Sequence, residues 1–414
     1  MLIPRDYQAE ARDKALLFFA SSSKSRPILD LPTASGKSVI IALIVKELKG
    51  NVLVLQPSKE LLEQNYKKYA DVVASHPELE PASVYSASVG VKERSRVTFA
   101  TIGSIYKKAH EWADTDYVLI DECHEVSPQR EKLKNRDGSY KTTPVKASMH
   151  VQFFSVVKAK TLGLTATPYR MKTYNDPFTG GKVSKINLLP RESPKFFNDF
   201  LYSVPARKLY EDGHLCPIKY LPLAFDVSPL EYNKSGSEYT DDSIEKAILQ
   251  NKIVQKIPDI LRQAFVKGQN SALVFVKSVK VARELSEKVP HSGYIHAETD
   301  PTERAEIIGN FKKGNIKTLF NVSVLTTGFD YPALDTIIIA RPTMSLSLYA
   351  QMIGRVMRNS PGKEYGCVVD MCGNVNRFGK VEEFRIENDD RYKGWVLRND
   401  KKVISGRNLA EVTS

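Results

Sequence analysis

The fold of this chain is decided by the stretch Leu31-Pro32-Thr33-Ala34-Ser35-Gly36-Lys37-Ser38, which lies between two apolar runs. Residues 28–31 predict a buried strand, and residues 39–45 predict a helix buried on most faces. A small-residue loop at the positive end of a helix can turn its backbone N–H groups around an anion. We therefore predict a nucleotide phosphate site formed by Thr33, Ser35, Gly36 and Lys37, with the Ser38 hydroxyl binding Mg²⁺. The usual pattern begins with Gly where this chain has Leu31, and Gly-Lys-Ser alone is common, so the prediction depends on the motifs that follow.

Length and composition limit the classes of protein to which this chain can belong. A chain of 414 residues favours two domains. No apolar run approaches the roughly 18 residues of a membrane span, and the N-terminus has no signal-peptide segment, so we expect a cytoplasmic protein. A net charge of +12 favours a polyanion partner such as nucleic acid, although a generically basic protein is the alternative. The four cysteines form no C-x-x-C pair, which argues against a zinc ribbon or a disulfide framework.

In the first half, strands alternate with helices, which predicts a parallel sheet with its active edge at the carboxyl ends of the strands. The predicted strands are residues 52–55, 97–101, 117–120 and the run from 161 to 168, which has hydroxyls at its end. Asp121 and Glu122 follow the third of these strands. We predict that Asp121 holds Mg²⁺ and that Glu122 orients and deprotonates the attacking water, against the alternative of two exposed acids. The hydroxyls of Thr165 and Thr167 could bond these acids.

Three further features of this half have two interpretations each. Gln8, ahead of the phosphate loop, could read an adenine edge, but on its own a surface glutamine is the simpler interpretation. Residues 130–146 form a basic loop or hairpin tip that is either solvated or in contact with nucleic acid. Residues 174–182 indicate a protruding hairpin, which could separate strands or be an ordinary surface loop.

The second half repeats the architecture without a phosphate loop. A new sheet is predicted to start at residues 219–223, and residues 349–358 are predicted to form a helix. Within it, Gln351, Arg355 and Arg358 form the pattern Gln-x-x-Gly-Arg-x-x-Arg. Arginines three apart share a helical face and can act on one anion, which for a transferring phosphate is worth roughly 10³–10⁵ in rate. A basic helix face is the alternative. Residues 395–400 predict a strand and a turn without a functional assignment.

The ordered set of motifs resembles the two-lobed superfamily 2 helicases over roughly residues 1 to 380. In that pattern Gln8 is similar to the adenine-reading glutamine, and Thr101 and Asp121-Glu122-Cys123-His124 match motifs Ib and II. The other matches are Lys37 and Ser38 in motif I, Pro57 and Glu60 in Ia, Thr165-Ala166-Thr167 in III, Phe275 in IV, Thr327, Gly328 and Asp330 in V, and Gln351, Arg355 and Arg358 in VI. Residues 5–8, 165–170 and 210–215 resemble the restriction-motor and DNA-repair branch, near RadD-like and phage branch-migration (UvsW-like) helicases.

The resemblance implies an α/β fold of two tandem RecA-like parallel-sheet lobes with the ATP site in the cleft between them. The expected domains are lobe 1 (1–210), lobe 2 (211–380) and a C-terminal extension (381–414). It also implies ATP and Mg²⁺ as cofactors, with Gly328 and Asp330 at the nucleotide and with Pro57, Thr101 and Thr327 on the nucleic acid. We expect an ATP-dependent DNA helicase or translocase of 3′ to 5′ polarity on single-stranded, forked or branched DNA, with no membrane partner. The alternatives are an RNA-dependent ATPase, which is less favoured, and a nucleotide-gated DNA-binding remodeller without unwinding.

Overall fold

The computed structural model describes residues 3–127, 130–131, 146–175, 182–233, 237–326, 328–400 and 402–406. The chain divides into two compact units. Unit 1 comprises Met1–Pro32, Gly36–Tyr169 and Leu188–Val204, and unit 2 comprises Thr33–Ser35, Arg170–Asn187 and Pro205–Ser414. The lobe boundaries expected at residues 210 and 380 stay predictions.

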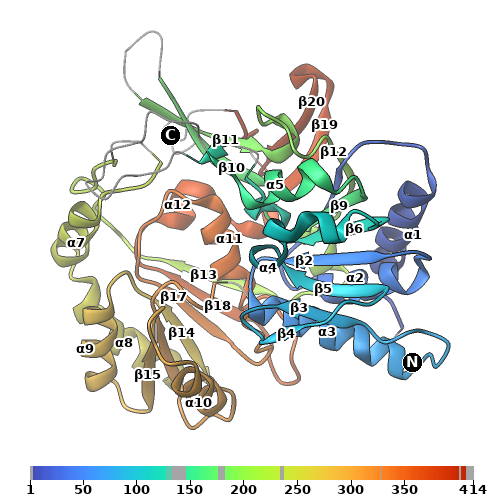
Figure 1. The fold of residues 1–414 in the computed structure, drawn as a ribbon. Coiled ribbons are helices and arrows are strands. Elements are labelled where there is room, and N and C mark those ends of the chain that lie inside the picture. The colour runs from blue at the N-terminus through green and yellow to red at the C-terminus, as the bar shows by residue number, and fades with distance from the viewer. Residues whose placement is uncertain are drawn as a thin grey trace. The chain divides into compact units, whose positions relative to one another are not determined.

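Unit 1 is built on an eight-stranded sheet with the order β12-β1-β9-β6-β2-β5-β3-β4, in which every pairing is parallel except β3 with β4 (Figure 1). The central strands are apolar and buried on both faces, as parallel strands covered by helices must be. The strands are β1 (Pro27–Asp30), β2 (Val52–Gln56), β3 (Ser83–Ser86), β4 (Val91–Lys92), β5 (Val97–Thr101), β6 (Tyr117–Asp121), β9 (Lys160–Thr165) and β12 (Asp199–Ser203). The helices and turns are α1 (Asp6–Ala20), α2 (Lys37–Glu47), α3 (Lys59–Ala74), α4 (Ile102–Ile105), η1 (Tyr106–Trp112), η2 (Cys123–Glu125), α5 (Met149–Val156) and η3 (Leu189–Arg191).

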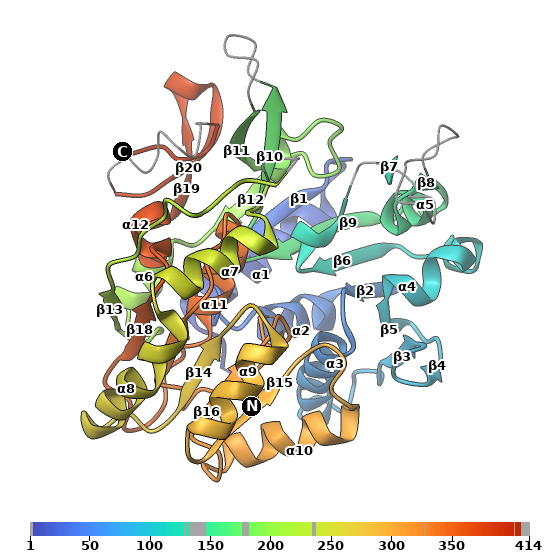
Figure 2. The same ribbon diagram turned by 90° about the vertical axis from the view of Figure 1, so that its left-hand side faces the viewer.

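Unit 2 has a six-stranded, fully parallel sheet of order β13-β18-β17-β14-β16-β15, with α9 packed beside β15 and β16 (Figure 2). Two sheets of mainly parallel strands, with helices connecting the strands, confirm the predicted α/β fold class. The strands are β13 (Ile218–Pro222), β14 (Ala272–Phe275), β15 (Ser292–Ile295), β16 (Thr318–Asn321), β17 (Thr336–Ile339) and β18 (Gly366–Asp370). The helices and turns are α6 (Ala206–Glu211), α7 (Asp241–Gln250), α8 (Ile253–Val266), α9 (Val279–Lys288), α10 (Pro301–Lys312), α11 (Leu346–Gly354), α12 (Asn374–Phe378), η4 (Val381–Glu383) and η5 (Asp390–Tyr392).

One predicted helix is wrong at its carboxyl end. α11 stops at Gly354, so Arg355 is its C-cap and Arg358 lies beyond the helix. The reason is a long-range contact, because the Arg355 guanidinium donates to the carbonyl oxygens of Thr326 (2.9 Å) and Phe329 (2.7 Å). Arg355 and Arg358 therefore do not share a helical face.

A small β structure, which apart from Tyr169 and Leu188 belongs to unit 2, is formed by segments far apart in the sequence. It consists of β10 (Tyr169–Asn175), β11 (Lys182–Leu188), β19 (Arg385–Asp389), β20 (Gly394–Arg398) and residues 402–406, and we call it the C-terminal β module. The Ile404 N–H donates to the Leu397 carbonyl (2.9 Å), and the Gly406 N–H donates to the Ile186 carbonyl (2.8 Å). Ile186, Leu397 and Ile404 are each 1% exposed, so these segments share a core.

The module confirms part of the prediction for residues 395–400. Arg398 pairs with Val403 across a turn that starts at Asn399, as the pattern indicates. The pattern gave no sign of β19, which pairs antiparallel with β20 along its whole length.

Other predictions from the sequence concern the cysteines, membrane spans, metal sites and two surface loops. All four cysteines are buried and free. Within the described ranges, no helix is long and apolar enough to cross a bilayer, and no group of acidic, histidine and cysteine side chains could hold a metal ion by itself. Most of the basic segment at 130–146, and the tip of the predicted hairpin at 176–181, lie outside the described residues. The two strands flanking that tip, β10 and β11, pair with each other as expected.

Candidate nucleotide-binding and catalytic site

The phosphate loop adopts a backbone that turns sharply before α2. Gly36 is the N-cap of α2 with φ +78°, and Ala34 also has a positive φ of +68°. A Cβ at Gly36 would come within 2.7 Å of the Gln8 amide nitrogen, so both the backbone angle and the space require glycine there. Leu31 is fully buried, and its N–H donates to the Thr165 carbonyl (2.9 Å). The residue that departs from the usual pattern thus extends the β1 ladder and fills the core.

Gln8 is not the surface residue of the simpler interpretation. It is 5% exposed, and its side-chain oxygen accepts a hydrogen bond from the Arg5 N–H (3.0 Å), which caps α1. Its amide nitrogen then lies beside Gly36, as the close approach above shows. The structure therefore brings Gln8 to the phosphate loop, while its contact with adenine stays a prediction.

Of the two acids at the end of β6, Asp121 is buried and Glu122 is largely shielded from solvent, so the alternative of exposed strand-end carboxylates is wrong. Asp121 is 3% exposed and accepts hydrogen bonds from the Asn65 amide (2.7 Å) and the Glu122 N–H (2.9 Å). Glu122 has a left-handed backbone, φ +46° and ψ +49°, which is unfavourable for a non-glycine residue and is typical of functional positions. Its side chain is 12% exposed.

The phosphate loop and the acids meet through Lys37. Its Nζ lies 3.4 Å from Glu122 Oε1, and the two side chains are 13% and 12% exposed. Ser38 Oγ accepts a hydrogen bond from the Gln64 amide (3.2 Å). Sequence reasoning missed Gln64 and Asn65. A signal existed for Asn65, because it falls on the buried helical face with Leu61, Leu62 and Tyr69.

His124 connects the acids to the end of β9. Its Nδ1 lies 2.7 Å from Thr165 Oγ1, 3.3 Å from Thr167 Oγ1 and 3.3 Å from Glu122 Oε2. The Thr165 hydroxyl also donates to Glu122 Oε2 (3.3 Å). The predicted contact between strand-end hydroxyls and acids is therefore confirmed for Thr165, whereas Thr167, within the described part of the chain, is linked to Glu122 through His124.

Burial and neighbouring charges set the protonation of this cluster. Burial, followed by the charge of Glu122, raises the pKa of Asp121 to about 6. Burial alone would raise the pKa of Glu122, but Lys37 and His124 outweigh it, and that pKa falls well below its usual value. Burial would lower the pKa of His124, but its contacts with Glu122 and Glu125 raise it to about 9. At neutral pH the cluster holds an ionised Glu122 between two cations.

The raised pKa of His124 predicts a pH-dependent stability. Protonated His124 stabilises the folded state fully below about pH 6.5, its ordinary pKa, and this stabilisation is lost as the pH rises through about 9. The free energy of unfolding should therefore fall between pH 7 and pH 9.5, and His124→Asn should remove much of that fall. Urea unfolding across this range measures it. His110→Asn, at an exposed position, is the matched control, and an equal fall in His124→Asn and wild type would contradict the prediction.

In unit 2 the predicted arginines converge on Thr326, Phe329 and Asp330. Arg355 is 7% exposed and bonds the carbonyls of Thr326 and Phe329, as described above. Arg358 forms an ion pair with Asp330, and burial lowers its pKa to about 10. Gly328, two positions before Asp330 in the chain, has a left-handed backbone with φ +71°. Gln351 is half-buried on α11, and its carbonyl accepts from Arg355 Nε (3.4 Å).

The residues predicted to contact nucleic acid are only partly brought together. Pro57 is exposed directly after β2, and Gln56 before it pairs with Thr101 at the end of β5. Thr101 is 8% exposed, and its hydroxyl lies within 3.1 Å of Ser86 Oγ and 2.8 Å of Ser104 Oγ. Thr327 lies outside the described residues. Their contacts with nucleic acid stay predictions.

Comparisons with known proteins agree with this geometry. Residues 1–170 match the family described as type III restriction enzyme, res subunit, and residues 253–360 match the helicase conserved C-terminal domain. The chain is 23% identical over 398 residues to a 51.5 kDa protein of a Lactococcus phage, which covers 94% of this chain and 74% of the phage protein. It is 24% identical to the DNA 3′-5′ translocase XPB2 of Sulfurisphaera tokodaii, covering 86% of this chain and 78% of that protein.

Solved structures show the same fold. The DNA-bound type ISP restriction-modification enzyme LlaBIII matches with a TM-score of 0.62 and 17% identity over 90% of this chain and 28% of that one.

Some sequence relatives are longer than this chain. The chain spans 57% of a relative from Saccharomyces cerevisiae, 61% of one from Sulfolobus islandicus filamentous virus and 58% of one from Schizosaccharomyces pombe.

Proposed function

We propose that this chain, which combines the two domains of the ATP-dependent superfamily 2 helicases and translocases, uses ATP to move along DNA and acts on forked or branched substrates. The observation that carries the proposal is the Lys37–Glu122–His124 cluster beside a phosphate loop. A lysine that can bind phosphate, and an ionised carboxylate that can activate water, are what phosphoryl transfer to water requires.

In this proposal Gln8 binds the adenine, and Thr33, Ser35, Gly36 and Lys37 bind the phosphates. The Ser38 hydroxyl and the Asp121 carboxylate offer the oxygen ligands that Mg²⁺ prefers, and the Gln64 and Asn65 amides orient them, so the residues fit this ion. Bound there, Mg²⁺ would offset the negative charge of the phosphates.

Glu122 is the proposed general base, and its pairing with Lys37 suggests how it is controlled. While Lys37 pairs with Glu122, the carboxylate is a weak base because its pKa is low. ATP phosphates attract Lys37, and loss of this partner raises the basicity of Glu122. His124 and Thr165 keep the carboxylate in place throughout. The base thus becomes effective when ATP is bound.

Arg355 and Arg358 are the proposed donors to the phosphate charge that develops during hydrolysis, with Gln351, Gly328 and Asp330 supporting them. An arginine in this role typically contributes 10³–10⁵ in rate. In this structure the Arg358 guanidinium forms an ion pair with Asp330, which a phosphate would displace during hydrolysis.

Three observations favour DNA as the nucleic acid along which the protein moves. The relative from Sulfurisphaera tokodaii is named a DNA translocase, the N-terminal family is that of a restriction enzyme, and the net charge of +12 favours a polyanion. We propose 3′ to 5′ polarity with Pro57, Thr101 and Thr327 on one strand, and a role in repair, recombination or replication. Within the superfamily we propose the restriction-motor branch, near RadD-like and phage branch-migration helicases.

The test is ATP turnover without nucleic acid, with single-stranded DNA and with RNA of the same length, followed by strand displacement on fork, flap and four-way junction. We expect DNA to stimulate turnover more than RNA, and ATP-dependent displacement on at least one branched substrate. Stimulation by RNA alone would assign an RNA-dependent ATPase. ATP-dependent DNA binding without displacement or translocation would assign a nucleotide-gated remodeller.

A further inference from the structure

The side chain of Lys363 bonds to both backbone segments that carry the Arg358–Asp330 ion pair. Its ammonium donates hydrogen bonds to the carbonyl oxygens of Val356 (2.8 Å) and Arg358 (2.9 Å), in the segment that follows α11. It also donates to the carbonyl oxygen of Pro332 (3.3 Å), two residues after Asp330 in the chain. Lys363 therefore joins the backbone of Arg358 to the backbone beside its ion-pair partner.

The early end of α11 explains why a lysine is needed here. Because the helix stops before them, the carbonyls of Val356 and Arg358 have no N–H partner in a following helical turn. The Met357 carbonyl between them accepts from the Cys216 N–H (2.8 Å), and the other two accept from Lys363. An ammonium has three N–H donors and no acceptor, so three carbonyls match it one to one.

This lysine keeps its charge although it is half-buried. Burial lowers the pKa of Lys363 to about 8, so most of the side chain is protonated at pH 7. Throughout the described ranges its hydrogen-bond partners are neutral carbonyls, and no carboxylate pairs with it. The ammonium charge strengthens each of the three bonds.

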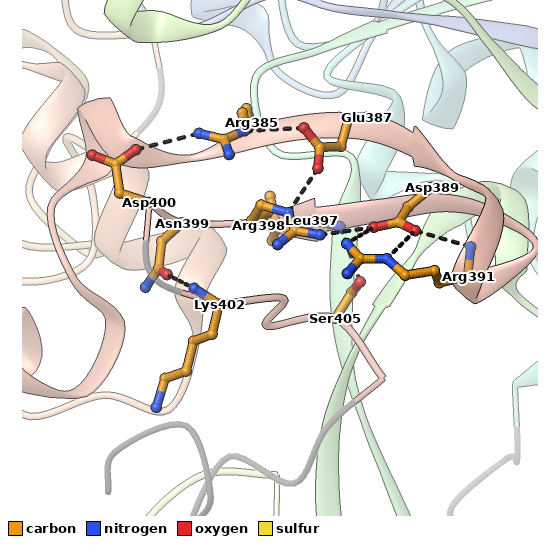
Figure 3. Close-up of polar contacts among 10 residues, drawn as sticks. All are labelled: Arg385, Glu387, Asp389, Arg391, Leu397, Arg398, Asn399, Asp400, Lys402 and Ser405. Atoms are coloured by element: carbon orange, nitrogen blue, oxygen red, sulfur yellow. Dashed lines mark hydrogen bonds and ion pairs between the residues drawn. The ribbon is translucent and has the colours of Figure 1, made fainter.

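The C-terminal β module holds its arginines in a different way. In Figure 3 the Arg398 guanidinium pairs with the carboxylates of Glu387 (2.7 Å) and Asp389 (2.8 Å). A further carboxylate beside Arg358 would repel the phosphate that this arginine is proposed to bind. Carbonyls hold Lys363 without adding a negative charge, which suits a position next to a phosphate site.

Arg355 ties the same two segments together a second time. Its guanidinium donates to the Phe329 carbonyl (2.7 Å), directly before Asp330 in the chain. Lys363 bonds the Pro332 carbonyl on the other side of that acid. The segment that carries Asp330 is thus held both before and after the acid, once by each cation.

We propose that Lys363 is a positioning residue, which fixes the backbone of Arg358 for its action on the phosphate. This inference rests on the proposed function of Arg358 and adds a residue outside the pattern Gln-x-x-Gly-Arg-x-x-Arg. A shift of the Arg358 backbone moves its guanidinium, and a misplacement of about 1 Å in a group that acts on the reacting atoms can cost about 10²-fold in rate. ATP affinity should change little, because the phosphate loop provides most of it.

The experiment measures single-turnover hydrolysis of ATP by the full chain with saturating single-stranded DNA, together with ATP affinity. Lys363→Met keeps the length of the side chain without its donors and should lower the rate by roughly 10²-fold with little change in affinity. Lys363→Arg keeps donors and charge and should lose less. Lys160→Met is the matched control. Lys160 is also half-buried and donates to a carbonyl, that of Phe19 (3.1 Å) in unit 1, so this variant should keep the wild-type rate.

The double variant Lys363→Met/Arg358→Gln separates positioning from general damage to the fold. If Lys363 acts through Arg358, adding Lys363→Met to Arg358→Gln causes no further loss of rate, because the two residues act as a unit. A further loss overturns the proposal, as do equal losses in Lys363→Met and Lys363→Arg. Thermal unfolding shows whether each variant folds. If Lys363→Met does not, Lys363→Gln, with an amide donor on a shorter side chain, replaces it in each comparison.

Two other rates test the proposed function separately. No DNA-stimulated hydrolysis by the wild type refutes the proposed motor. A wild-type rate in Arg358→Gln refutes the role of Arg358, and the positioning role of Lys363 with it. A large loss in Arg358→Gln, together with a Lys363→Met rate equal to that of Lys160→Met, refutes only the positioning role.

Discussion

Glu122→Gln should lower DNA-stimulated ATP turnover by about 10²–10⁴-fold while ATP still binds. The amide keeps the size and shape of the carboxylate but cannot take a proton from water. ATP affinity should be equal to or higher than that of the wild type, because Lys37 loses the carboxylate that competes with the phosphates (3.4 Å). Steady-state phosphate release at saturating single-stranded DNA, together with equilibrium binding of ATP, separates the two effects.

The matched control is Glu125→Gln. Glu125 also faces His124, at 3.5 Å from Nε2, and the substitution removes the same charge, but its side chain is 58% exposed and is not the proposed base. We expect turnover within about tenfold of wild type. Equal losses in the two variants would mean that the charge around His124 matters and that Glu122 is not the base.

Arg358→Gln should lower turnover by roughly 10³–10⁵-fold with little change in ATP affinity. The Arg358 side chain is 19% exposed, and even with a pKa lowered to about 10 it is protonated at neutral pH. Among the described residues its acidic partner is Asp330, which a phosphate would have to displace in the proposed mechanism. Single-turnover hydrolysis with ATP bound in advance measures the loss in the chemical step.

Two comparisons make this result specific. Arg391→Gln removes a guanidinium that is 77% exposed on the C-terminal β module, and turnover should be unchanged. Arg355→Gln should lower both turnover and the thermal unfolding midpoint, because Arg355 also donates hydrogen bonds to the carbonyls of Thr326 and Phe329. If Arg358→Gln retains turnover within tenfold of wild type, Arg358 does not act on the phosphate.

Local signals predicted much of the fold. The strand predicted at 97–101 is β5, Val97–Thr101, and the strand predicted at 117–120 lies within β6, Tyr117–Asp121. Both depend on residues within a few positions of each other. The phosphate loop is predictable for the same reason, since glycine at position 36 satisfies a local backbone demand.

Long-range contacts were not predictable in this way. The end of α11 depends on carbonyls 26 and 29 residues before Arg355, and the sequence around residues 349–358 contains no trace of them. Gln64 shows the same limit within the site. It is an ordinary polar residue on a helix, and only the folded chain brings its amide to the Ser38 hydroxyl.

The pairing of Ser405 with Ile186 has a consequence for synthesis of the chain. At roughly 5–20 residues per second, a ribosome needs about 10 to 40 seconds to go from one residue to the other. Throughout that interval the backbone groups on the β11 edge have no native partner, and an open strand edge is a template for association with other nascent chains. A chaperone that covers this edge should therefore raise the yield of folded protein most when translation is slow.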